Sequence, residues 1–225
     1  IVCGGRNDDD VAVDSMQHLV AGDNAKILKW QALPSMHTAR YCPSICLWED
    51  MKAINYHESE LLIVAGGCNE TDGDLNTCSI YDFHSGEWNE ISSTNVARSC
   101  STLVHWKYRN KCVIVGGSNN ACKSVEQYDL IKDTWVTLPT LNEPHRNYPC
   151  VWIDNSLLYG SYHGLLCVCG DGAKKDAQHM QDGLGHIEIL DVRDSANKWQ
   201  TVAHLSSFFM NDEYKTKYCR RLVCC

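Results

Sequence analysis

Residues 61–88 read LLIVAGGCNETDGDLNTCSIYDFHSGEW. An apolar run ends in a glycine pair, an acidic loop follows, and a second strand-like segment leads through a short turn to a tryptophan. The apolar run lacks the alternation of a half-exposed strand, which predicts a strand covered on both faces. The turn at residues 84–87 is short enough to join two antiparallel strands in a hairpin. The stretch therefore predicts a small antiparallel sheet.

The same pattern recurs along the chain. Four apolar runs end in glycines, which are Gly4, Gly5, Gly66, Gly67, Gly116, Gly117, Gly170 and Gly172. The strand after the polar loop carries an aromatic or apolar residue before an aspartate, in the pairs Tyr81-Asp82, Tyr128-Asp129 and Leu190-Asp191. A tryptophan closes each unit, at Trp30, Trp88, Trp135 and Trp199. An arginine then opens the next unit, at Arg40, Arg98 and Arg146.

A glycine pair, a Tyr-Asp pair and a tryptophan six residues beyond the aspartate resemble the kelch repeat, whose unit is about fifty residues long. The resemblance implies an all-β fold, a kelch-type β-propeller of four-stranded blades. About four blades are represented, as a partial ring or a fragment. Residues 1–225 are predicted to form one propeller region. Its blades are placed at 1–38 (partial), 39–95, 96–143, 144–206 and 207–225, the last being the start of a further blade or a closing strand.

The physical properties of the repeated residues agree with stacked sheets. A sheet that is apolar on both faces has to be covered on both, and copies stacked in a ring achieve this. Glycine at a strand end permits positive φ and a close approach between neighbouring sheets. The tyrosines and tryptophans combine a large apolar body with a polar edge, which suits the gap between blades.

Composition excludes several classes of function. The net charge of −8, without a basic block, argues against nucleic acid as a partner. No apolar stretch reaches the roughly 18 residues that cross a bilayer, so no membrane association is expected. Most of the fourteen cysteines lie in apolar runs, where a thiol behaves as a small hydrophobic group. This favours reduced thiols in a cytoplasmic protein, with a secreted disulfide framework as the alternative.

The sequence predicts neither catalysis nor a cofactor nor a metal site. The glycine pairs precede no helical pattern, so a nucleotide-binding turn is not expected. The clusters at 8–10 and 72–74 lack the spacing of an EF-hand loop, and Cys167 and Cys169 are not part of a C-x-x-C pair. Motifs of hydrolytic or nucleophilic enzymes are missing.

The resemblance implies a non-catalytic scaffold that binds another protein. Kelch domains of BTB and F-box adaptors present a loop-built face that recognises a protein segment for a ubiquitin ligase. The alternative is a cytoskeletal, actin-associated docking protein. A kelch-fold enzyme, such as a copper oxidase or a sialic-acid isomerase, rests on fold analogy alone.

The resemblance also points to candidate binding residues. In adaptor propellers the arginine that opens each blade often lines the central pocket. Arg40, Arg98 and Arg146 would then suit a protein or peptide ligand with acidic or phosphorylated groups. The alternative, equally compatible with the sequence, is that each arginine bonds to neighbouring backbone carbonyls. The loops after the glycine pairs are expected on the same face, with Asn69, Glu70, Asp72, Asn119 and Asn120.

Overall fold

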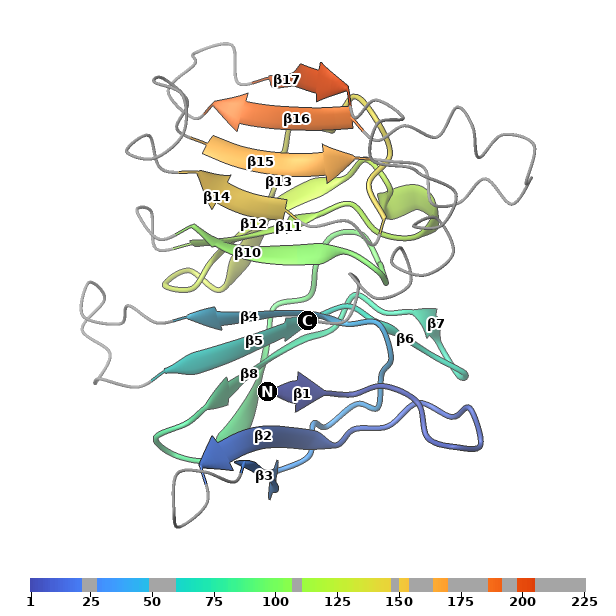
Figure 1. The fold of residues 1–225 in the computed structure, drawn as a ribbon, viewed down its shortest axis with the longest axis vertical. Helices are drawn as coiled ribbons and strands as arrows, with labels where there is room; N and C mark the ends of the chain where they lie inside the picture. The colour runs from blue at the N-terminus through green and yellow to red at the C-terminus, as the bar shows by residue number, and fades with distance from the viewer. Residues whose placement is uncertain are drawn as a thin grey trace.

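The computed structural model describes residues 1–21, 28–48, 60–106, 111–146, 150–153, 164–169, 186–191 and 198–204. These residues form antiparallel strands joined by loops, together with one short 3-10 helix, η3 (Asn119–Ala121) (Figure 1). Across the described ranges, no helix has the length and apolar character that a membrane span requires.

Three four-stranded sheets follow a three-stranded one along the chain. The first sheet contains β1 (Val2–Cys3), β2 (Met16–Ala21) and β3 (Leu28–Leu33). The second contains β4 (Ser44–Trp48), β5 (Leu61–Ala65), β8 (Cys78–Asp82) and β9 (Glu87–Ile91). The third contains β10 (Thr102–Trp106), β11 (Lys111–Val115), β12 (Val125–Asp129) and β13 (Thr134–Leu138). The fourth contains β14 (Cys150–Ile153), β15 (Gly164–Cys169), β16 (His186–Asp191) and β17 (Trp199–His204).

Strands pair in chain order within every sheet, so that each sheet is built from one continuous stretch of sequence. A small hairpin of β6 (Cys68–Asn69) and β7 (Gly73–Asp74) lies in the loop after the second glycine pair. The four sheets fall within 1–38, 39–95, 96–143 and 144–206. The predicted segment 207–225 and the glycines Gly170 and Gly172 lie outside the described residues.

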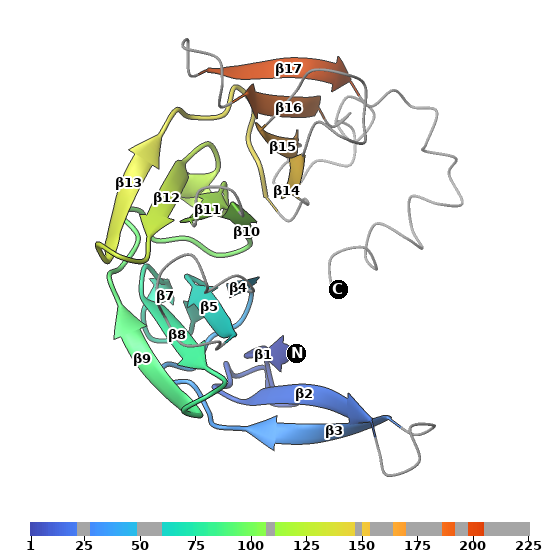
Figure 2. The ribbon, with the colours of Figure 1, turned by 90° about the vertical axis from the view of Figure 1, so that its left-hand side faces the viewer.

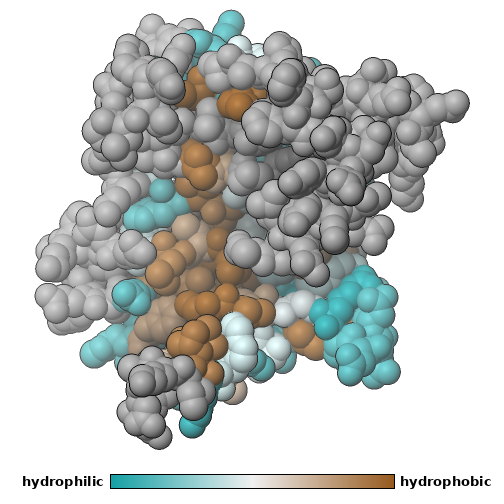
Figure 3. All heavy atoms as spheres, in the orientation of Figure 1, coloured by the Kyte–Doolittle hydropathy of each residue, from teal (hydrophilic) through white to brown (hydrophobic). Residues whose placement is uncertain are grey.

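The sheets follow one another in an arc (Figure 2). Strands β4, β10 and β14, which come first in their sheets, lie on the inner side of the arc, and β3, β9, β13 and β17 lie on the outer side. Figure 3 looks onto the inner side, where hydrophobic side chains form a band down the middle. The predicted all-β fold with four-stranded sheets is therefore confirmed, while closure of the arc into a ring stays a prediction.

Successive residues of the glycine-ended strands pack into two different interfaces. In β5, Leu61 and Ile63 belong to the hydrophobic cluster shared with the third sheet, whereas Leu62 and Val64 belong to the cluster shared with the first. All five residues of β5 are buried because neighbouring sheets cover both of its faces. The same division occurs in β11, where alternate residues contribute to the interfaces on either side of the third sheet.

The closing tryptophans fasten each sheet to the segment before it. Their indole N–H groups donate to backbone carbonyls of the preceding connection, in bonds from Trp88 to Pro34, from Trp135 to Ser92 and from Trp199 to Pro139, each 2.8 Å long. The rings of Tyr81 and Tyr128 lie against those of Trp88 and Trp135 at a tilt, with ring centroids 5.2 and 5.0 Å apart. A tryptophan at this position therefore packs only where a sheet precedes it.

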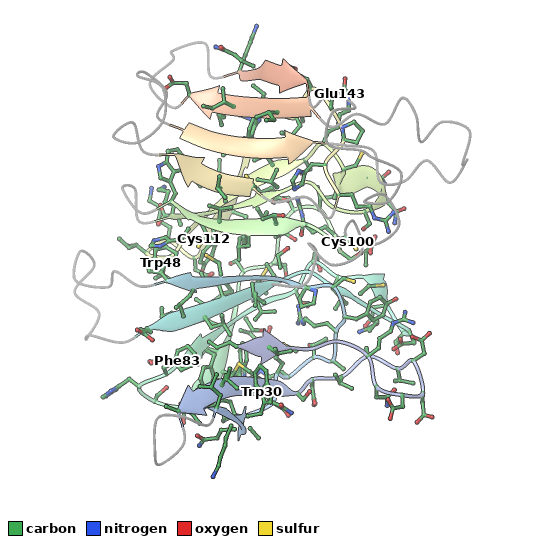
Figure 4. All side chains as sticks on the ribbon, viewed as in Figure 1. Trp30, Trp48, Phe83, Cys100, Cys112 and Glu143 are labelled. Atoms are coloured by element: carbon green, nitrogen blue, oxygen red, sulfur yellow. The ribbon has the colours of Figure 1, made fainter. Side chains whose placement is uncertain are left out.

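Trp30 departs from the prediction that the repeated tryptophans fill the gap between neighbouring sheets. It has the same register as the other closing tryptophans, because it pairs with Leu19 as Trp88 pairs with Tyr81. Its side chain is nevertheless 56% exposed, and it lies on the outermost sheet in Figure 4. The physical reason is that no sheet within the described residues covers this face of the first sheet.

The glycine pairs hold neighbouring sheets together at the end of the molecule opposite the Trp48 end of β4 (Figure 4). The second glycine of each pair donates its N–H to the carbonyl of the residue that opens the next unit. The bonds run from Gly5 to Arg40 (2.9 Å), from Gly67 to Arg98 (2.9 Å) and from Gly117 to His145 (2.8 Å). Both glycines of each pair have positive φ. We call these three bonds the glycine joints.

Substitution of Gly66 tests the glycine joints. Gly66 has a φ of +63°, and a Cβ atom there would collide with the backbone oxygen of Arg98, which cannot move without opening the joint. We expect Gly66→Ala to lower the free energy of unfolding by about 3 kcal/mol, through backbone strain and steric conflict together. Chemical denaturation monitored by tryptophan fluorescence measures this loss.

Gly73→Ala is the matched control. Gly73 also has positive φ, at +70°, but no atom lies within 4 Å of its would-be Cβ. We expect it to cost only the conformational term, about 1 kcal/mol. Equal losses for the two variants would contradict a close contact at Gly66.

Candidate functional site

The end of the molecule that carries the glycine joints is built from loops of successive units. This glycine-joint end lies on the right-hand side of Figure 1. It contains the connection between β1 and β2, the β6–β7 hairpin and the loop that includes η3. Most of the residues that the sequence predicts for binding are in these loops. The arginines, however, have a different environment.

Arg40 and Arg98 are fully buried, each with 0% exposure. The Arg40 guanidinium donates to the carbonyls of Gly66 (2.7 Å) and Thr77 (2.9 Å). Arg98 makes the equivalent bonds to the carbonyls of Gly116 (3.0 Å) and Ser124 (3.3 Å). This burial does not fit the prediction that the two arginines line a binding pocket. The contacts instead match the alternative, in which each arginine bonds to backbone carbonyls.

Arg98 also forms an ion pair with Glu126, whose side chain is itself completely buried. The Glu126 carboxylate accepts further hydrogen bonds from the backbone N–H groups of Asn95 (2.7 Å) and Val96 (3.2 Å). Burial lowers the pKa of the Arg98 guanidinium, and the charge of Glu126 opposes this effect. Glu188 has a similar place in the fourth sheet, where it accepts from the backbone of Asn142 and Glu143. Sequence reasoning missed both glutamates.

In the fourth sheet's unit the position of the repeated arginine is taken by His145. It is fully buried, and its carbonyl accepts the third glycine joint. Arg146 lies one residue later, so the sequence alignment placed it one position out of register. The number of residues after the closing tryptophan indicates the correct register. It is ten from Trp30 to Arg40, from Trp88 to Arg98 and from Trp135 to His145.

The predicted loop residues Asn69, Glu70 and Asp72 lie together on the β6–β7 hairpin. Asn69 shapes the turn, because its side-chain oxygen accepts from the backbone N–H of Asp72 (2.7 Å). Glu70 and Asp72 are exposed. Glu70 reaches back to the first unit, where its carboxylate accepts from the N–H of Ala12 at 3.1 Å. This contact connects the loop of the second unit with the loop of the first.

Asp74 connects the same hairpin with the third unit, a role that sequence reasoning did not assign. Its carboxylate accepts hydrogen bonds from Ser118 and from the predicted residue Asn119, the latter at 2.8 Å. Burial alone would raise the pKa of Asp74. Hydrogen bonds from Ser118, Ser99 and Asn119, together with the charge of Arg146, outweigh burial and lower the pKa. Asn120, the remaining predicted residue, is exposed beside this contact.

The site therefore has the features of a recognition surface. Exposed polar side chains from three units meet at the glycine-joint end, and hydrogen bonds between the loops fix their positions. Among the residues described, no group of three or more His, Cys, Asp or Glu side chains is placed to hold a metal ion. The side chains of Cys167 and Cys169, considered as zinc ligands, lie outside the described part of the chain.

Removal of Arg98 tests its structural role. Arg98→Ala leaves the Glu126 carboxylate buried without its partner charge, and we expect the free energy of unfolding to fall by about 3 to 5 kcal/mol. Arg6→Ala is the control, because Arg6 is exposed and loses only the ion pair with Asp10 and the contact with the Tyr41 ring, which should together cost much less stability than the change at Arg98. Urea denaturation measures both. A structural role for Arg98 would be refuted if the two variants were equally stable.

Two comparisons with known proteins agree with this architecture. Residues 108–142, which include β11, β12 and β13, match the kelch motif. An F-box/kelch-repeat protein of Arabidopsis thaliana is 22% identical over 178 residues, which cover 68% of this chain and 42% of that protein. The chain thus spans about two fifths of the length of this curated relative. The chain therefore contains a kelch motif and has distant similarity to an F-box/kelch-repeat protein.

Proposed function

We propose that this chain is a non-catalytic scaffold that binds another protein, and that it serves as the substrate-recognition part of a ubiquitin-ligase adaptor. The observation that carries the proposal is the joined loop surface at the glycine-joint end. The distant similarity to an F-box/kelch-repeat protein supports the adaptor role. The recognition face of this chain is the surface formed by loop residues 6–15, 68–74 and 118–124.

Contacts between the loops pre-organise this face. Glu70 joins the second loop to the first, and Asp74 joins it to the third. A binding surface whose loops are already ordered loses less conformational entropy when it binds. Binding residues of proteins often lie on loops that a rigid scaffold holds in position.

The charges on this face favour a partner segment that carries lysine or arginine. Its exposed carboxylates, at Asp8, Asp9, Asp10, Glu70 and Asp72, outnumber its exposed basic residues, Arg6 and Lys123. Arg6 pairs with Asp10, so the face keeps an excess of negative charge. Arg40 and Arg98, which would have attracted an acidic peptide, are buried and already bonded to carbonyls. Charge complementarity across an interface guides encounter and selects partners. The proposed ligand is therefore a basic protein segment, in place of the acidic one that the sequence suggested.

Peptide binding tests the charge of the face. Fluorescent peptides of equal length, rich either in lysine and arginine or in aspartate and glutamate, are titrated with the chain and followed by anisotropy. We expect the basic peptide to bind more tightly, with an affinity that falls as salt increases. The double variant Glu70→Gln, Asp72→Asn should weaken it several-fold, because two exposed carboxylates are lost while an amide oxygen at position 70 can still accept from the N–H of Ala12. Glu87→Gln, which removes an exposed carboxylate at the far end of the second sheet, should have no effect. Tighter binding of the acidic peptide would contradict the assignment.

Protein turnover tests the adaptor role separately. We expect proteins that bind the wild-type chain, but not the Glu70→Gln, Asp72→Asn variant, to become longer-lived when the protein is depleted from cells. Their half-lives are measured after translation is blocked. Unchanged half-lives, together with co-sedimentation of the chain with actin filaments, would contradict the adaptor role and favour a cytoskeletal docking protein.

A further inference from the structure

Two cysteines occupy the same repeat position in neighbouring units and meet at the glycine-joint end. Cys42 and Cys100 each follow a buried arginine by two residues, in Arg40-Tyr41-Cys42 and Arg98-Ser99-Cys100. The backbone N–H of Cys100 donates to the carbonyl of Cys42 at 3.1 Å. Figure 4 shows Cys100 between the second and third sheets. The pair therefore spans the contact between two units.

The backbone holds both residues in an unusual conformation. Cys42 has a φ of 49° and Cys100 a φ of 57°, in the left-handed region that residues other than glycine rarely adopt. Residues held in such conformations cluster at functional sites. The backbone hydrogen bond between the two residues keeps their Cα atoms near the separation of roughly 4.4 to 6.8 Å that a disulfide spans. Their side chains also meet, because the Cys42 and Cys100 thiols are hydrogen-bonded to each other.

The surroundings favour the thiolate of Cys100. A hydrogen bond from the Cys42 side chain, helped by Ser99 and by the Arg146 guanidinium, outweighs burial and lowers the pKa of Cys100 to about 6. The same hydrogen bond raises the pKa of Cys42, because its proton is held between the two sulfur atoms. One nucleophilic sulfur atom and one protonated thiol therefore coexist at neutral pH.

Access to the pair is open from solvent. Cys42 is exposed and Cys100 is half-buried. Both thiols are free, which distinguishes this pair from an existing structural crosslink. Buried thiols such as Cys78 and Cys112 lack this access, and burial raises the pKa of each.

We propose that Cys42 and Cys100 form a thiol modification site that reacts with peroxides and closes to a reversible disulfide between the second and third units. The Cys100 thiolate attacks one oxygen of hydrogen peroxide, the O–O bond breaks, and hydroxide leaves, which gives a sulfenic acid at Cys100. Cys42 sulfur then attacks the Cys100 sulfur. The S–S bond forms, the S–O bond breaks, and the Cys42 proton leaves with the oxygen as water. Two electrons pass from the two sulfur atoms to the peroxide, and a dithiol reductant reverses the bond.

The first test maps the disulfide. The full chain is treated with one equivalent of hydrogen peroxide, the remaining thiols are blocked with N-ethylmaleimide, and the protein is digested without reductant for mass spectrometry. We expect the first crosslinked peptide to join Cys42 with Cys100 and to disappear after dithiothreitol. A first disulfide between other cysteines, or modification without a crosslink, overturns the proposal.

The second test separates the roles of the two thiols. In Cys42→Ser, the sulfenic acid at Cys100 has no thiol to attack it, so dimedone should label Cys100 after peroxide treatment. The wild-type chain should show little labelling, because the disulfide forms first. Cys122→Ser, at a half-buried thiol of the neighbouring loop, is the matched control and should behave as wild type. Equal dimedone labelling of wild type and Cys42→Ser would contradict the assignment of Cys42 as the second thiol.

The third test follows the pH dependence of Cys100. Its rate of alkylation by iodoacetamide should rise with pH to half of its maximum near pH 6. Arg146→Gln removes the neighbouring positive charge, and the midpoint should move up by about one pH unit. Because the charge of Arg146 also acts on Asp74, the melting temperature of the variant is measured to confirm that the protein stays folded over the pH range used. A midpoint above pH 8 in the wild-type chain overturns the proposal.

Discussion

The structure depends on one repeated hydrogen bond, in which a glycine N–H of one sheet meets the carbonyl that opens the next. The donor is the second glycine of a pair, at a strand end with positive φ. The acceptor carbonyl lies so close to the first glycine of the pair that a Cβ atom there would not fit. Each such bond fixes the distance between two sheets at one end. The tryptophan indole fixes the distance at the outer strands through a second carbonyl. The hydrophobic clusters between the sheets then fill the space that these two contacts define.

The repeated arginine connects the two sides of the glycine joint at Arg40 and at Arg98. Its carbonyl accepts from the glycine of the preceding sheet, while its guanidinium donates to the first glycine carbonyl of its own sheet, as Arg98 does with Gly67 and Gly116. A guanidinium has five donors in a fixed plane, so it can satisfy several carbonyls in a space that excludes water. His145 takes the backbone part of this role without the charge. The glycine joint itself is thus made by main-chain atoms alone.

The sequence predicted the sheets well because the repeat carries their signals several times. Runs such as Leu61–Ala65, with apolar residues on both faces, have few alternatives to a strand between two sheets. The environment of the arginines could not be predicted, since the same donors suit a peptide carboxylate or a backbone carbonyl. Glu126 was missed for a related reason. Its partners come from the connection before the strand, and a lone glutamate in a strand indicates a solvent-facing position. The meeting of Cys42 and Cys100 depends on how two units stack, which spacing alone does not reveal.

Because main-chain atoms make the joints, the architecture places few demands on side-chain identity. A glycine pair and a tryptophan in each unit are the residues that the contacts between sheets require, and the opening residue can be arginine or histidine. Loop sequences can therefore diverge freely while the sheets keep their spacing. An identity of 22% with a relative is compatible with an architecture of this kind. Substitutions can therefore change the loop surface, unit by unit, without altering the contacts that hold the sheets together.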